Sequence, residues 1–220
     1  MDESIENRGL SPIIVTEFAA TEWHERHHSL TMSYSTLQPP FTLKFREMSK
    51  KELKDYFAWF QNIMPQRLDE LRRAVQEVPG FEAWQADFTP ASLDQLGEWF
   101  AAQVETRPRT QEEIQEIESR SSFPIEIPGE DLTNRTFSLA MDIGMYFSQV
   151  FLKNHPALRW DQQFGNRKDA YYGQPILMGF GPVPFNPVWL LVTLAYGVVS
   201  KRKTGKSLHD LYDIWAKMIK

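Results

Sequence analysis

The feature that most constrains the fold is the stretch of residues 170–200, which contains no charged residue at all. Its second half, residues 188–199, is almost continuously apolar and must leave water, either inside a globular domain or in a membrane. This run is about 12 residues long, whereas a membrane-spanning helix needs roughly 20. The sequence therefore predicts a buried helix, opened by Pro187 and capped by Asn186.

Three basic residues, 201–203, follow the apolar run. Such a cluster suits a helix C terminus, where the dipole favours cations, and it equally suits the flank of a membrane-associated segment. Association with a membrane through residues 183–199 therefore remains an alternative.

Helical spacing of apolar residues dominates the rest of the chain. Capping-box patterns at 49–52 and 110–113 open two helices, and Pro65 is expected to break or restart the first of them. Thr89 and Pro90 predict a cap and first turn of another helix, while Ser207 predicts the cap of a last one. Residues 133–153 are apolar on nearly every side, which indicates a central helix covered by its neighbours.

Strand patterns are fewer and shorter. Phe41, Leu43 and Phe45 alternate with polar residues and predict a strand, while residues 158–164 and 171–180 predict a hairpin. We therefore expect a predominantly helical, single-domain α+β fold with a small antiparallel sheet. Residues 1–31 are interpreted as a loosely attached N-terminal arm and residues 32–220 as the domain.

Composition excludes several classes of function. The 24 Lys and Arg residues against 29 Asp and Glu residues give a net charge of −5, which argues against a general nucleic-acid binder. The absence of cysteine excludes disulfides, thiol nucleophiles and cysteine-ligated zinc. An acidic N terminus without an apolar secretion signal leads us to expect a cytoplasmic protein.

One motif with catalytic precedent is present. His24, Glu25 and His28 satisfy the H-E-x-x-H pattern, in which two histidines bind zinc from one helix face and the glutamate polarises water. Charged and polar residues occupy the intervening positions, where zinc peptidases place small or apolar ones. A zinc-dependent hydrolase is kept as an alternative, but the sequence predicts no cofactor and no bound metal.

The candidate partner-binding residues cluster near the predicted hairpin. Large amphipathic rings beside charged residues are typical of interface hot spots, although a hairpin lying on helices would also fold its aromatic residues inward. On the central helix, a polar stripe is formed by Ser138, Asp142 and Gln149. Asp142 points either into a pocket or toward a basic partner, unless this stripe is a solvated edge or Asp142 accepts backbone hydrogen bonds. The candidates are Trp160, Asp161, Arg167, Asp169, Tyr171, Tyr172 and Asp142.

Three segments together, 48–60, 92–100 and 158–177, carry a resemblance. Residues 32–216 resemble uncharacterised bacterial proteins of unknown function. Their outline of buried helix, Leu-x-Trp strand and apolar helix is also similar to that of bacterial immunity-type proteins, which neutralise toxins. The resemblance implies a bacterial cytoplasmic protein that binds another protein, and it implies no catalytic residues.

The leading hypothesis is therefore a non-enzymatic protein-binding module, with toxin neutralisation as its most specific form. The acidic balance of the chain suits a basic partner. The sequence does not indicate an oligomeric state.

Overall fold

The computed structural model describes residues 34–120, 124 and 126–219, and the chain divides into the units Met1–Tyr34 and Ser35–Lys220. The predicted arm, residues 1–31, lies outside the described residues. Within the described part, six helices and two two-stranded antiparallel sheets form a mostly helical α+β fold, which confirms the expected class. The elements are α2 (Lys50–Gln76), α3 (Ser92–Gln103), β1 (Thr106–Pro108), α4 (Gln111–Arg120), β2 (Glu130–Leu132), α5 (Asn134–Asn154), β3 (Arg159–Gln162), β4 (Pro175–Met178), α6 (Pro187–Val199) and α7 (Ser207–Ala216).

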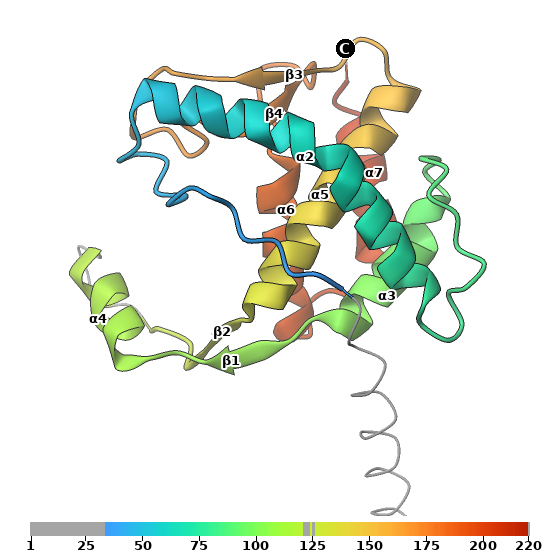
Figure 1. Ribbon diagram of the computed structural model, residues 1–220, viewed down its shortest axis with the longest axis horizontal. Coiled ribbons are helices and arrows are strands. Elements are labelled where there is room, and N and C mark those ends of the chain that lie inside the picture. The colour runs from blue at the N-terminus through green and yellow to red at the C-terminus, as the bar shows by residue number, and fades with distance from the viewer. Residues whose placement is uncertain (1–33, 121–123, 125, 220) are drawn as a thin grey trace, which may run out of the picture. The chain divides into compact units, whose positions relative to one another are not determined.

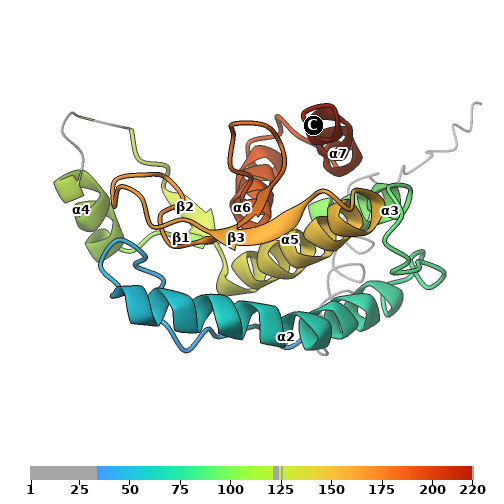
Figure 2. The same cartoon turned by 90° about the horizontal axis from the view of Figure 1, so that it is seen from above.

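Helix α5 is the centre of the domain, as its all-round apolar sequence predicted. It lies between α2 and α6 (Figure 2), and almost every side chain from Thr136 to Phe151 is buried. The Thr133 side chain caps it by accepting a hydrogen bond from the backbone of Thr136. A helix covered on both flanks needs apolar residues on both, which explains why apolar residues occur on nearly every side of α5.

Helix α2 runs unbroken through Pro65, so the predicted break is wrong. The capping box of Ser49 and Glu52 opens it as predicted. Pro65 lies on the exposed side, while Met64 and Arg67 beside it are buried, so contacts with the core align both halves of the helix. Figure 1 shows the axis of α2 changing direction partway along, as expected where a proline removes one backbone hydrogen bond.

The predicted strand around residues 41–45 is also wrong. No described strand pairs with this segment, and Leu43 adopts a left-handed conformation (φ 56°) with its side chain 41% exposed. Phe41 and Phe45 instead pack edge-on against Tyr56, at ring distances of 5.4 and 5.1 Å. The alternating aromatic residues therefore lie along the first turns of α2 rather than in a sheet.

Two helix starts differ from those predicted. Thr89 does not cap α3, because its hydroxyl donates to Asp87 and the helix begins two residues beyond Pro90. Ser207 is the first residue of α7 rather than its cap, and its hydroxyl accepts a hydrogen bond from the backbone of Thr204. Both helices thus begin without a side-chain cap.

The predicted hairpin is confirmed as β3 and β4, which pair antiparallel with Trp160 opposite Leu177. The second sheet, β1 with β2, was not predicted, because three-residue strands are too short to show alternation. Helix α4 lies between these two strands in the sequence. Its capping box between Thr110 and Glu113 is formed as predicted.

Candidate functional site

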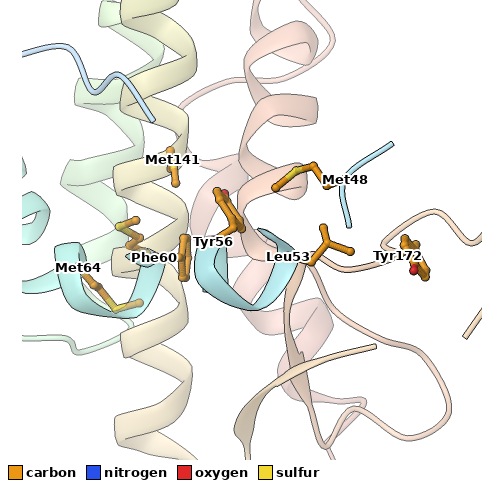
Figure 3. Close-up of a cluster of buried hydrophobic side chains, with 8 residues drawn as sticks. Met48, Leu53, Tyr56, Phe60, Met64, Met141 and Tyr172 are labelled. Atoms are coloured by element: carbon orange, nitrogen blue, oxygen red, sulfur yellow. The ribbon is translucent and has the colours of Figure 1, made fainter. Parts of the chain in front are cut away.

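Two of the predicted partner-binding residues contribute to the core. Tyr172 is 3% exposed and belongs to a buried cluster with residues of α2 and α5 (Figure 3). Trp160 is half-buried and meets the ring of Phe60 edge-on at 5.3 Å. Their large apolar surfaces are therefore used, wholly or in part, to attach the hairpin to α2.

The charged hairpin residues lie on or near the β3–β4 loop. Arg167 and Asp169 are exposed, and Asp161 and Tyr171 are half-buried. The Arg167 guanidinium donates to the carbonyl of Arg46 (3.1 Å), and Asp169 accepts from the backbone of Asn166 (3.1 Å). The first contact ties the loop to the segment before α2 and the second lies within the loop, and Arg167 and Asp169 are the two predicted residues that are exposed.

Asp142 stands apart from the hairpin, with no exposed surface. Its carboxylate receives two hydrogen bonds from the guanidinium of Arg67, Nε to Oδ1 at 2.9 Å and Nη2 to Oδ2 at 2.7 Å. This bidentate ion pair joins α5 to α2 inside the domain. Asp142 therefore does not lie on a solvated edge of α5. Its carboxylate forms an ion pair inside the domain.

Three of the six exposed large apolar side chains among the described residues lie on α6, which was predicted to be buried. Asn186 caps this helix as predicted, accepting from the backbone of Trp189 (3.0 Å). Leu191, Leu194 and Ala195 are buried, so one side of the helix faces α5. The opposite side is uncovered among the described residues, and we call it the α6 face: Trp189 (56% exposed), Thr193, Tyr196 (39%) and Val199 (39%).

The sequence carried a signal for this surface. Trp189, Thr193, Tyr196 and Val199 recur at intervals of three and four residues and fall on one side of a helix. Because the opposite side is equally apolar, hydrophobicity alone could not tell the covered side from the uncovered one. Contiguous exposed apolar patches larger than a few hundred Å² are uncommon on monomeric proteins and mark sites of interaction.

Gly144 of α5 brings the two helices into close contact. A Cβ atom at this position would lie 2.8 Å from the Cα atom of Val188 and 3.1 Å from its backbone nitrogen. The backbone of α6 therefore lies directly against α5 at this point, and the absence of a side chain on Gly144 permits the approach. The α6 face is held at its N-terminal end by this crossing.

A polar contact fixes Tyr196 near the other end of α6. Its hydroxyl donates to Oδ1 of Asp131 on β2 (2.5 Å), and Oδ2 of Asp131 accepts from Arg109 (2.7 Å). Partial burial and the neighbouring Asp131 carboxylate raise the pKa of Tyr196 to about 12. The ring is thus held in one orientation although 39% of its surface is exposed.

We expect the Asp131→Asn variant to lower the pKa of Tyr196, because it removes the negative charge that disfavours tyrosinate. The raised pKa means that neutral Tyr196 stabilises the folded state, fully below the ordinary value of 10.0, and that this stabilisation is lost as the pH rises toward about 12. Alkaline titration of tyrosinate absorbance, with Tyr196→Phe subtracted, measures both values. An unchanged pKa in Asp131→Asn would contradict the assigned role of Asp131.

A cavity of about 550 Å³ opens beside the N-terminal end of α6. Segment 36–45 and parts of α2 and α5 form its walls, and Trp189 stands in its lining. A second hollow of about 650 Å³ follows the C-terminal half of α6, where Tyr196 and Val199 meet Arg202 and Lys203. The α6 face therefore lies between an apolar cavity and a hollow lined by two cations, Arg202 and Lys203, and two carboxylates, Glu130 and Asp131.

The three cations 201–203 are exposed, and no ion-pair partner for them is found among the described residues. Lys203 lies across Gly197, where a Cβ atom would come within 2.6 Å of its side chain. Positive charge thus stands at the C-terminal end of an otherwise uncharged helix.

The described residues hold no group of three or more His, Asp or Glu side chains that could bind a metal ion. The predicted zinc motif, His24, Glu25 and His28, lies outside them. His209 contacts the carboxylate of Asp94 at 2.7 Å, an exposed pair between α7 and α3. None of the described helices is both long and apolar enough to cross a membrane.

Comparison of the chain with protein-family models, with curated proteins and with solved structures finds no match. Function must therefore be inferred from the surface and the cavities of the domain.

Proposed function

We propose that the chain is a cytoplasmic, non-enzymatic module that binds another protein through the α6 face. One observation carries the proposal: Trp189, Tyr196 and Val199 form an exposed apolar stripe on a helix that is itself fixed to the core helix. Trp and Tyr are the residues in which interface hot spots are richest, because they bury a large area at little conformational cost.

The charge around the stripe indicates the chemistry of the partner. The net charge of the whole chain, −5, would favour a basic partner, but binding depends on the charges beside the contact. The α6 face carries no charge. The hollow at its C-terminal end is lined by Glu130 and Asp131, of which Asp131 is paired with Arg109, and by Arg202 and Lys203, for which no ion pair is found among the described residues. We therefore infer a partner with an apolar ridge and carboxylates at the end that meets these cations, and toxin neutralisation is the most specific form of this proposal.

Site-specific photo-crosslinking tests the surface. A photoreactive residue placed at position 189 or 196 should yield one discrete adduct in the native cell. The same residue at position 214 should yield none, because Ile214 is an equally exposed apolar residue (55%) on α7 and serves as the matched control. Position 167 reports on the hairpin surface, which the sequence singled out.

Once the adduct identifies the partner, binding of the purified proteins should weaken by roughly 30-fold or more in Trp189→Ala, since a hot-spot side chain contributes about 2 kcal/mol or more. Ile214→Ala should bind as the wild type does, and the melting temperature of Trp189→Ala should change little. Crosslinking at position 167 alone would show that the interface lies on the hairpin. Equal affinity of Trp189→Ala and Ile214→Ala for the partner would reject the α6 face as the interface.

A further inference from the structure

The cavity beside α6 has a lining that carries no charge. Its volume of about 550 Å³ lies within the range of small-molecule sites, roughly 300–1,000 Å³. All 18 residues that line it are uncharged, although charged residues make up 24% of the chain. A charged ligand would lose its hydration there with no opposite charge to compensate.

A buried ion pair lies next to this lining. Ser138 lines the cavity and accepts the backbone N–H of Leu37 (2.7 Å), and the guanidinium of Arg67 lies 3.5 Å from the same hydroxyl. Arg67 itself is 4% exposed and is paired with Asp142. The ion pair thus lies behind the cavity wall and offers no free charge to a ligand.

The four amide side chains of the lining fall into two sets. Asn186 and Gln174 bond to each other (2.8 Å), and each makes a further bond to the backbone, so these amides serve the fold. The side chains of Gln38 and Asn134 are exposed and have no hydrogen-bond partner among the described residues. They supply neutral donors and acceptors at the cavity, whose other walls include the rings of aromatic residues.

We propose that this cavity binds an uncharged, largely apolar small molecule with an aromatic or alicyclic body and one amide, carbonyl or hydroxyl group. The aromatic walls accommodate the body, and the amides of Gln38 and Asn134 hydrogen-bond to the polar group. This site goes beyond the proposed protein-binding function, because it shares only Trp189 with the α6 face, and Tyr196 and Val199 take no part in it.

Competition between matched probes tests the charge selection. Nile red, a neutral dye, should bind the full chain saturably with one dye molecule per chain. 1-Naphthamide should displace it at least about tenfold better than 1-naphthoate or 1-naphthylmethylammonium, which share its ring system but carry a charge. Equal displacement by the charged compounds, or no saturable dye binding, overturns the proposal.

Variants locate the probe. Val192→Trp places a large ring in the cavity and should weaken dye binding about tenfold or more, whereas Ile214→Trp, outside the cavity, should leave it unchanged. If Val192→Trp does not fold, the double variant Gln38→Ala with Asn134→Ala decides, because both residues are exposed. It should weaken 1-naphthamide several-fold and 1-naphthoate little, and unchanged binding of 1-naphthamide rejects the site.

Two variants, Tyr196→Ala and Val192→Trp, separate the two proposals. Tyr196→Ala should abolish partner binding and leave dye binding unchanged, since Tyr196 does not line the cavity. Loss of dye binding alone in Val192→Trp would leave the protein-binding function standing, and loss of partner binding alone would leave the cavity site standing.

Discussion

Replacing Asp142 with alanine should lower the free energy of unfolding by about 3–5 kcal/mol. The carboxylate is fully buried and receives two hydrogen bonds from Arg67, which is itself 4% exposed. Removing the carboxylate leaves a guanidinium in the interior of the domain beside a new void, and a buried charge without its counter-charge is strongly destabilising. Denaturant unfolding followed by circular dichroism measures the loss.

The control is the double variant Arg67→Met with Asp142→Leu, which replaces both charges with apolar side chains of comparable size. It should recover most of the lost stability, because a buried ion pair contributes little beyond what good apolar packing supplies. A single variant as stable as the wild type would show that the pair does not hold α2 to α5.

Replacing Gly144 with leucine should cost about 3 kcal/mol, at the upper end of the range for overpacked cores. Even the Cβ atom would lie 2.8 Å from Val188 and 3.2 Å from the carbonyl carbon of Pro187, and both of these are backbone atoms. Backbone cannot turn aside as a flexible side chain can, so the N-terminal end of α6 must move away from α5. Thermal and denaturant unfolding measure the cost.

Gly129 provides a matched control, because a Cβ atom there would meet nothing within 4 Å. Gly129→Leu should therefore leave stability within about 0.5 kcal/mol of the wild type. Since Val188 and Trp189 line the cavity, Gly144→Leu should also weaken binding of Nile red, whereas Gly129→Leu should not. Equal stabilities of the two leucine variants would contradict the close crossing of α5 and α6.

These two contacts connect the fold to the proposed functions. The pair of Arg67 and Asp142 fixes α2 to one side of α5, and Gly144 fixes α6 to the other (Figure 2). The cavity lies among these three helices and segment 36–45, so its shape depends on both contacts. The α6 face depends mainly on the second.

The sequence by itself determined the elements whose signals are local. The capping boxes at Ser49 and Thr110 and the cap at Asn186 each depend on residues a few positions apart, and the structure contains all three. The central position of α5 was equally readable, because a helix that is apolar all round can be stable only when covered.

Tertiary contacts decided the rest. Core packing kept α2 continuous across Pro65. Phe41 and Phe45 pack against Tyr56 of α2, although their alternation is typical of a strand. Trp160 and Tyr172 pack in or against the core cluster. Asp142 forms an ion pair with Arg67, which lies 75 residues away along the chain.

The charge-free stretch shows the same division. Its sequence determined that α6 would form and would enter the domain, because apolar surface leaves water wherever it can. Which side of α6 would be covered depended on the approach of α5 at Gly144, a contact between residues far apart in the chain. Hydrophobicity is a property of each residue, whereas burial is a property of its neighbours, and only the folded chain specifies the neighbours.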